Sequence, residues 1–425
     1  MLIEFKVTNF RSVKETQTLS MVAGNGLKDR ALESNTFESG ITNFPKLVRS
    51  SVIYGPNASG KSNLIAAITF MENMVRESAR EAQVGESIEI APFRLDAATR
   101  EKDTEFEIHF IAENVRYQYG FRLNAQRITS EWLIAYPHGS PQRWFERQYD
   151  AVNKKYEYEF KPSFAEKARQ ERADQTIANN LYLSVAVQKN SQQLLPAFTW
   201  FQKKLNYILS MNHLGSGRTS KLCQEVEGKN KVLAFMNAAG IKVKDLLVER
   251  KLFTLDDLPE DFPEELKQKV LKEMDGAVTY NAKFQYQAAD GELVTFDLDD
   301  ESDGTKALFS FAARWLDLLE TDAVLFVDEI DTSLHPLLVH YLIKLLHSSK
   351  SRAQLIFTTH DTTLLSQSIM RRDQVWFVEK DQQQSSQLYS LADFSPRKNE
   401  ALEKGYLSGR YGAIPFLSEL DFYGE

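Results

Sequence analysis

The sequence has a single cysteine, Cys223, among its 425 residues, which excludes a disulfide within the chain and fits a reducing compartment. It has no apolar run close to the ~18 residues that a membrane-spanning helix requires. Its first residues, Met1 to Val7, alternate apolar and charged side chains as a strand does, and they lack the pattern of a secretory signal. We therefore expect a cytoplasmic protein with no membrane contact, in which Cys223 is a small buried side chain.

An excess of positive charge is also missing, since 51 lysines and arginines face 59 aspartates and glutamates and the net charge is −8. This balance argues against a protein that coats nucleic acid indiscriminately. Residues 151–251 nevertheless hold 17 basic and 9 acidic side chains, a surplus of 17 − 9 = +8, so the rest of the chain carries −8 − 8 = −16. Because these basic residues are scattered, two interpretations stay open: solvated helix faces, or a surface for DNA, RNA or an acidic partner.

What the chain does contain is a glycine-rich loop, Gly55-Pro-Asn-Ala-Ser-Gly-Lys-Ser62. The apolar run from Leu47 to Tyr54 leads into this loop as a strand, and an amphipathic helix follows it. The apolar stripe of that helix consists of Leu64, Ile68, Met71 and Val75. So short a pattern also occurs by chance, but its position between a strand and a helix indicates a phosphate-binding loop.

The residue types of the loop suit the phosphates of ATP. Glycines let the backbone curl around an anion, so that amide hydrogens and the helix N-terminus point at it. Lys61 supplies a positive charge for the β- and γ-phosphates, and the Ser62 hydroxyl can bind Mg²⁺. The other predicted nucleotide contacts here are Asn57, Ala58, Ser59, Gly60 and Asn63.

A second apolar run, Ala323 to Val327, is too short for a helix and is typical of a buried central strand. Two acids follow it. At the carboxyl end of a parallel strand, Asp328 can hold Mg²⁺ together with Ser62. Glu329 can orient and deprotonate an attacking water. The alternative is that both acids merely cap the next helix.

Two further features suggest phosphate binding. Ser302, Gly304 and Thr305 stand at the start of an amphipathic segment, so a hydroxyl, a glycine amide and a helix N-terminus converge. The strand that begins at Gln354 ends in His360, which can contact a γ-phosphate. Each has a plain alternative, an ordinary helix cap at Ser302 and a turn histidine at His360.

The order of these motifs resembles that of the ABC-type ATPase heads of the SMC, RecF and OLD group. In that family two heads sandwich ATP, and the signature motif of one head completes the Walker A and Walker B site of the other. The resemblance makes Gly55 to Ser62 the Walker A loop, Ser302 to Thr305 the signature, and Asp328 with the catalytic Glu329 the Walker B acids.

The same resemblance extends to smaller motifs. Asp331, which opens Asp331-Thr-Ser-Leu-His-Pro336, corresponds to a nucleotide-contacting D-loop, and His360 to the switch histidine. The opening Val7 to Ser12 is similar to the first strand of these heads, which implies that Arg11 lies near the phosphates. Pro92-Phe93-Arg94 stands where a Q-loop belongs but contains no glutamine, so the Q-loop stays unassigned.

The tail Gly405 to Pro415 resembles that of stand-alone bacterial relatives in phage-defence loci, similar to the ATPase subunits of PARIS, Septu and abortive-infection systems. By residue type it is a glycine-interrupted, aromatic packing segment. Arg410 within it has either a structural role or a contact with a nucleotide or partner. No acidic cluster in the tail resembles the nuclease domain of OLD proteins, so we expect no intrinsic nuclease activity.

The expected fold is α/β: an ABC-ATPase head with a mainly parallel P-loop core sheet, an antiparallel side sheet at 104–136 and a compact helical insertion. Lys61 and Asp328 are 328 − 61 = 267 residues apart, and the surplus is a mostly helical pattern at 160–275. Prolines interrupt that pattern and no heptads are sustained, which argues against a coiled coil. The expected divisions are an N-terminal ATPase lobe at 1–150, a helical insertion at 151–275, a C-terminal ATPase lobe at 276–395 and a tail at 396–425.

Three functions are compatible with this chemistry. The favoured one is an ATP- and Mg²⁺-dependent ATPase, a homodimer or a higher assembly of dimers, that controls a separately encoded toxin or nuclease in anti-phage defence. The second is a DNA repair ATPase that binds DNA ends or gaps through the basic insertion. The third is phosphoryl transfer to a small acceptor. It is disfavoured because the signature and switch residues would have no role in such an enzyme.

Overall fold

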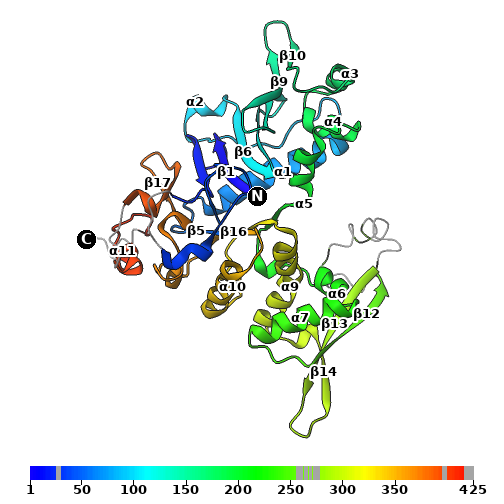
Figure 1. The fold of residues 1–425 in the computed structure, drawn as a ribbon, viewed down its shortest axis with the longest axis vertical. Helices are drawn as coiled ribbons and strands as arrows, with labels where there is room; N and C mark the ends of the chain where they lie inside the picture. Colours follow the sequence, from blue (N-terminus) through cyan, green and yellow to red (C-terminus); the bar gives the residue numbers. More distant parts are fainter. Residues whose placement is uncertain are drawn as a thin grey trace, which may run out of the picture. The chain divides into compact units, whose positions relative to one another are not determined.

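The computed structural model describes residues 1–24, 30–254, 278–394 and 400–415 and the single positions 262, 267 and 270 (Figure 1). The chain forms two compact units. The first consists of Met1–Leu209, Leu318–Ile330 and Leu342–Glu425, and the second of Ser210–Asp317 and Asp331–Tyr341. Each unit contains both strands and helices, so the expected α/β class is confirmed. These borders differ from the lobe borders expected at 150, 275 and 395, and the functional division into lobes stays a prediction.

The core sheet of the first unit has six strands in the described part of the chain, and only its last pair, β17 and β18, is antiparallel. In spatial order the strands are β11 (Leu205–Ile208), β15 (Val324–Val327), β16 (Gln354–Thr358), β5 (Ser50–Tyr54), β17 (Val375–Lys380) and β18 (Ser386–Ser390). Every residue of β15, β16 and β5 is buried, as in a sheet covered on both faces. Because these three strands are parallel, their carboxyl ends lie along one edge of the sheet.

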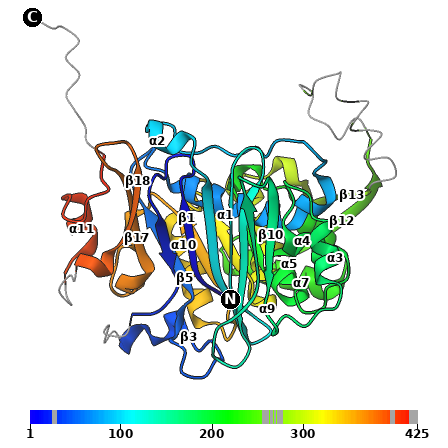
Figure 2. The ribbon, with the colours of Figure 1, turned by 90° about the horizontal axis from the view of Figure 1, so that it is seen from above.

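A second sheet in this unit has seven described strands and is antiparallel throughout. Its strands in spatial order are β10 (Lys155–Phe160), β9 (Gln142–Asp150), β8 (Ile128–Tyr136), β7 (Val115–Leu123), β6 (Thr104–Ala112), β1 (Leu2–Thr8) and β2 (Gln17–Ser20). Figure 2 shows these strands running side by side between β1 and β10. The antiparallel side sheet predicted at 104–136 is thus confirmed.

Helix α1 (Lys61–Glu81) connects the two sheets of this unit through one hydrophobic core. Its predicted apolar stripe is buried and consists of Leu64, Ile68, Met71 and Val75. The stripe belongs to the same cluster as Ile53 of β5 and Phe106 of β6. Two further helices, α4 (Tyr182–Gln188) and α5 (Leu195–Lys203), pack against α1. The helix that follows the phosphate loop is therefore anchored in the main core of the unit.

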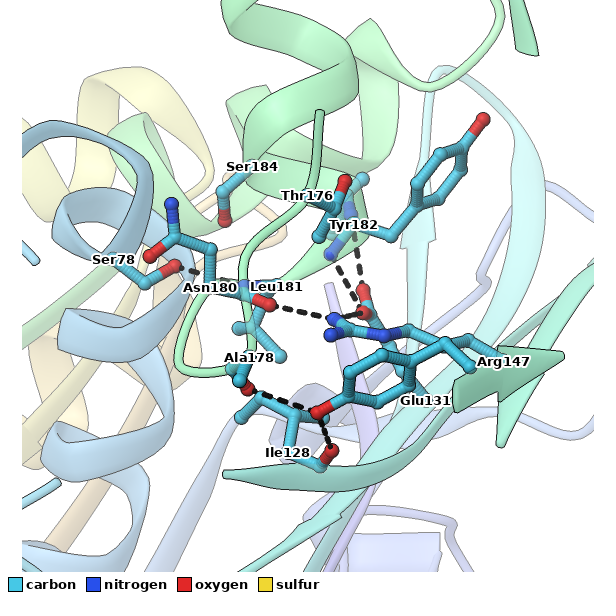
Figure 3. Close-up of polar contacts among 12 residues, drawn as sticks. Ser78, Ile128, Glu131, Arg147, Thr176, Ala178, Asn180, Leu181, Tyr182 and Ser184 are labelled. Carbon is cyan, nitrogen blue, oxygen red and sulfur yellow. Dashed lines mark hydrogen bonds and ion pairs between the residues drawn. The ribbon is translucent and has the colours of Figure 1, made fainter. Parts of the chain in front are cut away.

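A buried ion pair fastens α4 to the side sheet (Figure 3). Glu131 of β8 and Arg147 of β9 are both fully buried, and their charged groups approach to 3.7 Å. The Glu131 carboxylate accepts the backbone N–H groups of Tyr182 at 2.6 Å and Leu183 at 2.9 Å, at the N-terminus of α4. Arg147 donates to the carbonyl oxygen of Asn180 at 2.7 Å. Burial raises the pKa of Glu131, and these donors oppose that rise.

The second unit is built on a three-stranded antiparallel sheet of β12 (Asp245–Leu252), β13 (Val278–Gln287) and β14 (Leu293–Asp297). Helix α6 (Gly217–Leu222) packs on β13, and α7 (Val226–Ala238) packs on β12. Phe284 of β13 meets Phe309 of α9 (Asp303–Thr321) edge to face, with ring centroids 5.1 Å apart. The strands predicted between Val278 and Phe296 are confirmed.

The prediction of a mostly helical segment at 160–275 is wrong at two places, because β11 and β12 are strands. β11 has only four residues, too few for a two-residue period to stand out, and it exists through its pairing with the distant β15. In β12 the last four residues are exposed, and three of them are charged. This half of the strand therefore lacks the alternation of apolar and polar side chains that predicts a strand. Two prolines of this segment, Pro259 and Pro263, lie outside the described residues.

The remaining α-helices and strands in the described part of the chain have between two and thirteen residues. They are β3 (Thr36–Phe37), β4 (Leu47–Val48), α2 (Ala97–Arg100), α3 (Arg169–Asp174), α10 (Pro336–Ser348) and α11 (Leu402–Leu407). Among the described residues, no helix combines the length and the apolar character needed to cross a membrane.

The described part of the tail is an aromatic packing segment, as predicted. Tyr406 and Tyr411 stack on Phe377 of β17, with ring centroids 5.4 and 6.0 Å apart. Arg410 forms an ion pair with Glu400, which favours the structural role over a contact with a nucleotide. Residues 396–399 and 416–425 of the predicted tail region lie outside the described residues.

Candidate nucleotide-binding site

The loop between β5 and α1 is turned so tightly that its two glycines have no room for a side chain. A Cβ atom at Gly55 would lie 2.3 Å from the carbonyl oxygen of Val378, and one at Gly60 would lie 2.1 Å from Oγ of Ser386. Gly60 also has a φ of 112°, in the region that glycine alone adopts readily. Lys61 then begins the helix. The predicted loop and helix are present, and β5 is the strand before them. Leu47 and Val48 of the predicted strand form the separate β4, which pairs with β3 in another sheet.

Two serines that were not among the predicted site residues, Ser12 and Ser386, hold this loop in place. Ser386, at the start of β18, donates its hydroxyl to the Ser59 carbonyl oxygen at 2.6 Å and lies 2.8 Å from the hydroxyl of Ser12. The Asn63 amide donates to Ser12 at 2.7 Å. The only signal for Ser386 in the sequence is that it closes a polar turn. Its contact with the loop spans more than three hundred positions of the chain and follows from the fold alone.

The predicted phosphate ligands differ in how far they are exposed. Lys61 is 6% exposed, and its ammonium group donates to the carbonyl oxygens of Gly55 at 2.7 Å and Pro56 at 3.2 Å. Ser62 in the first turn of α1 is exposed. Of the other predicted contacts, Asn57 and Ala58 are exposed, Gly60 and Asn63 are half-buried, and Ser59 is buried. The lysine therefore lies against the loop backbone while the Ser62 hydroxyl faces solvent.

The two acids after β15 stand at the same sheet edge as the phosphate loop, since only β16 separates β15 from β5. Thr358, the last residue of β16, donates its hydroxyl to Oδ1 of Asp328 at 2.6 Å. The same hydroxyl oxygen accepts the backbone N–H of Glu329 at 2.8 Å. Glu329 is exposed and has a φ of 48°, a conformation that costs about 1–3 kcal/mol outside glycine. One threonine thus orients both acids, and sequence reasoning assigned it no role.

The donor set suits Mg²⁺, which is bound by one or two protein oxygens together with waters and substrate phosphates. Ser62 offers an exposed hydroxyl, and Asp328 offers Oδ2, which accepts no hydrogen bond from the described residues. Within the part of the chain that the structure describes, no group of three or more His, Cys, Asp or Glu side chains could hold a metal. A magnesium ion at this edge would therefore take its other ligands from phosphate and water.

His360 and Arg11 both lie just beyond the strands in which they were expected, because β16 ends at Thr358 and β1 ends at Thr8. His360 is exposed, two positions beyond β16, and its neighbour Asp361 accepts the Tyr54 hydroxyl on its carbonyl oxygen at 2.8 Å. That bond ties the histidine turn to the end of β5. Arg11 is exposed with a φ of 48°, and its guanidinium lies 5.3 Å from the ring centroid of Phe10. The neighbour of Arg11, Ser12, is the residue that contacts the loop.

The residues that resemble a signature motif belong to the second unit. The Ser302 hydroxyl accepts the N–H of Thr305 at 3.3 Å and lies 2.9 Å from the Thr305 hydroxyl, so Ser302 caps α9. A Cβ atom at Gly304 would lie 3.4 Å from the carbonyl oxygen of Ser333. A depression of ≈560 Å³ is lined by Ser302, Gly304, Thr305, Ser333, Leu334, His335 and Tyr341, among others. Asp331 is half-buried, two positions before Ser333. The capped helix end therefore opens on a concave surface.

The basic residues of 151–251 are divided between the two units, and many are neutralised by neighbours. The local ion pairs are Lys155–Glu157, Lys161–Glu159, Arg172–Glu166, Arg218–Asp317, Lys229–Asp245 and Lys231–Glu227. In contrast, Lys242, Lys244 and Arg250 are exposed and form no ion pair with a described residue. Solvated pairs therefore account for part of the surplus, and several exposed cations of the second unit, Lys221 among them, remain for a partner.

Comparisons with known proteins give one family and several distant structures. The family model described as "AAA domain, putative AbiEii toxin, Type IV TA system" matches residues 50–366. No match was found among curated protein sequences. One similar solved structure is an SmcHead bound to the C-winged helix domain of ScpA, with 14% identity, 92% of this chain and 97% of that chain covered, and a TM-score of 0.43.

Two further structures resemble the chain to a similar degree. The SMC head domain from Thermotoga maritima has 14% identity over 92% of this chain and 98% of that chain, with a TM-score of 0.39. The Smc head domain with an extended coiled coil bound to the C-terminal domain of ScpA, derived from Pyrococcus furiosus, has 13% identity over 96% and 98%, with a TM-score of 0.38. Likenesses this weak establish no relationship by themselves.

The family match is different in kind, because it spans most of the chain. It includes the phosphate loop at Lys61, the acids Asp328 and Glu329 and the helix cap at Ser302. Residues from both units thus fall within it. The chain belongs to this family of AAA-type ATPase domains.

Proposed function

We propose that this protein is an ATP-hydrolysing, ABC-type ATPase that works as a homodimer, or as a higher assembly of dimers. The observation that carries the proposal is the Thr358 hydroxyl, which holds Asp328 and Glu329 at the sheet edge where β5 leads into the phosphate loop. An acid beside such a loop binds Mg²⁺, and a second acid one residue on can deprotonate water. This pair favours hydrolysis over nucleotide binding alone.

In the proposed reaction the loop amides and Lys61 bind the β- and γ-phosphates. Glu329 accepts a proton from the water that attacks the γ-phosphorus, and the bond from that phosphorus to the bridging oxygen breaks to give ADP and phosphate. Ser62 and Asp328 would hold Mg²⁺, which would neutralise phosphate charge when bound. His360 is assigned a contact with the γ-phosphate, and Arg11 a contact with the phosphates from the turn after β1.

The proposed dimer follows from the signature residues. Each chain has one phosphate loop and one capped helix end at Ser302, and in the resembled ATPase heads each signature completes the site of another copy. Ser302, Gly304, Thr305 and Asp331 are therefore assigned to the nucleotide of the partner copy. Lys61→Ala should lose ATP binding, whereas Ser302→Arg should keep it and block ATP-dependent dimerisation, as measured by light scattering. ATP-driven dimers of the Ser302→Arg variant would remove the sandwich model.

The biological role we propose is control of a separately encoded toxin or nuclease in anti-phage defence. The toxin–antitoxin description of the family supports this class of partner. To test it, the protein is purified together with the products of neighbouring genes, with and without ATP. A toxin that co-elutes with wild type and is released on hydrolysis supports the role, and Glu329→Gln should retain that toxin in the presence of ATP.

A DNA repair ATPase is the second candidate, and it rests on Lys242, Lys244 and Arg250 of the second unit, which are exposed and form no ion pair with a described residue. Phosphate contacts of this kind make binding strongly salt-dependent. If this function is the right one, ATP should increase the affinity for DNA ends, and Lys242→Glu with Lys244→Glu should reduce both the affinity and its salt dependence. Equal DNA binding by the double variant would eliminate this candidate.

A further inference from the structure

Strand β14 is an apolar edge strand that the proposed function leaves without a task. All five of its residues, Leu293 to Asp297, are exposed, and the exposed fractions of Leu293, Val294 and Phe296 are 55%, 41% and 42%. β14 pairs with β13 on one side, and on its other side no described strand adjoins it. Figure 1 shows the β13–β14 hairpin extending past α6 and α7 of the same unit. An open, apolar edge of this kind is a template for another strand.

Two apolar residues of β14, Val294 and Phe296, continue the core face of its own sheet. Phe296 stands opposite Phe284, which is fully buried, and Val294 stands opposite Tyr286. The rings of Phe296 and Tyr286 meet edge to face with centroids 5.8 Å apart. The face that Phe309 of α9 contacts at Phe284 is thus left partly open at β14. A partner strand there would bury apolar side chains as well as pair its backbone.

The surroundings of β14 are strongly acidic. Residues 288–303 contain no lysine or arginine. The carboxylates in this stretch are Asp290, Glu292, Asp297, Asp299, Asp300, Glu301 and Asp303, and all but the half-buried Glu301 are exposed. Lys283 approaches Asp297 at 3.5 Å and offsets one of these charges. The remaining field selects a positively charged partner.

We propose that β14 is a docking edge for an extended segment of a different protein that alternates apolar side chains with lysine or arginine. Two β14 strands from two copies would set these carboxylates against each other, which disfavours self-pairing. The opposite edge strand, β12, contains two acids, Asp245 and Glu249, and two bases, Arg250 and Lys251, so the strand itself carries no net positive charge. A basic strand of another protein satisfies both the apolar face and the charge.

This inference rests on the proposed function in one respect, since a separately encoded effector is the kind of partner that would carry the segment. Asp297 is five positions before Ser302, as 302 − 297 = 5, and only the short turn η4 (Leu298–Asp300) lies between them. A partner strand docked on β14 would therefore pair with a segment that leads, within five residues, to the capped end of α9.

The test uses three synthetic fluorescent peptides of about eight residues, an ordinary strand length. One alternates valine with lysine, one alternates valine with glutamate, and one has the lysine peptide's composition with the lysines and valines in two blocks. Fluorescence anisotropy measures their binding to wild type, to Val294→Glu/Phe296→Glu, and to the control Val226→Glu, which alters an exposed valine of α7 in the same unit. Thermal unfolding checks that each variant is folded, and ATP turnover is measured for each.

The proposal expects the alternating lysine peptide alone to bind wild type and the control, and to bind the double variant at least about tenfold more weakly, a difference of ~1.4 kcal/mol. Equal binding to the double variant, binding of the glutamate peptide, or equal binding of the block peptide would overturn it. If the wild type self-associates and the double variant does not, a second copy occupies β14 and the proposal is wrong. ATP turnover should be unchanged in the double variant, so a failure of the ATPase assignment is recognised separately, in Glu329→Gln.

Discussion

Strands β15 and β14 are similar in sequence and opposite in environment. Val324-Leu-Phe-Val327 of β15 is buried at every position, whereas Leu293-Val-Thr-Phe-Asp297 of β14 is exposed at every position. Each strand leads to an acid. Asp328 after β15 is 8% exposed and bonded to Thr358, while Asp297 is exposed and near Lys283. Local composition therefore predicts that a segment is a strand. Whether the acid next to that strand becomes part of a site depends on the strands that pair with it.

The neighbours explain this difference. β15 has a parallel strand on each side, β11 and β16, and belongs to a sheet with buried strands throughout its centre. β14 has one described neighbour, β13, at the end of a three-stranded sheet. A carboxylate beside β15 is therefore oriented by a fixed hydroxyl in a partly desolvated place, where electrostatic interactions are stronger than in water. The carboxylates around β14 are solvated and act only as a collective field.

The largest predicted effect is on folding, from the same substitution in the two strands. Val327→Asp puts a carboxylate into a fully buried position and should cost about 4 kcal/mol or more of the free energy of unfolding. Val294→Asp changes an exposed position and should cost under about 0.5 kcal/mol. Urea denaturation of both variants measures the difference. Similar losses in the two would show that β14 is packed like a core strand, against the comparison.

A nearly equal effect is predicted for the buried ion pair of the side sheet. Glu131→Ala leaves Arg147 and the N-terminus of α4 without their shared acceptor, and should cost about 3–5 kcal/mol. The matched control is Glu157→Ala, which removes an exposed partner of Lys155 and should change stability little. If the two variants unfold at the same denaturant concentration, the pair shown in Figure 3 does not fasten α4 as described.

A moderate effect on catalysis is predicted at Thr358. Thr358→Val keeps the side-chain shape but removes the hydroxyl that orients Asp328 and Glu329, and should slow ATP turnover about 10–100-fold with ATP binding retained. Thr295→Val makes the same change on β14 and should leave turnover as in wild type. Steady-state kinetics with a nucleotide-binding assay separates the two steps. Normal turnover in Thr358→Val would mean that the acids need no such support.

The smallest effect is predicted for Asp297→Asn. The substitution removes an exposed charge that lies 3.5 Å from Lys283, and exposed pairs of this kind contribute about 0–1 kcal/mol. Turnover of ATP should be unaffected, in contrast to Asp328→Asn, which removes a proposed Mg²⁺ ligand. A clear loss of ATP turnover in Asp297→Asn would show that the acids around β14 contribute to catalysis, and would contradict the comparison.

Much of the fold was predictable because its signals are local. The strand before Gly55, the stripe of α1 and the buried run before Asp328 each lie within one short window, and all three are present. The side sheet also follows from alternation within single strands. The short β11 was missed because it is a strand only through its pairing with β15, far along the chain.

The parts of the candidate site that were not predicted are contacts between distant segments. Ser12 and Ser386 meet the phosphate loop only once β1 and β18 are in place, and serine is too common to mark such a position. Thr358 lies in the strand whose predicted role depended on His360. Its hydroxyl bonds to Asp328, 30 positions earlier, and this contact is not visible in the sequence. The exposure of β14 could not be predicted either, because its sequence is as apolar as that of the buried β16.

The central claim is that Glu329, beside the phosphate loop, is the general base of an ATPase. Its most direct test is single-turnover ATP hydrolysis by Glu329→Gln, with nucleotide binding measured in parallel and Glu301→Gln as a matched control near the exposed edge of β14. Removal of a general base predicts unchanged ATP binding and hydrolysis slowed on the order of 10²-fold or more, while the control hydrolyses ATP as wild type does. Normal hydrolysis by Glu329→Gln would contradict the account.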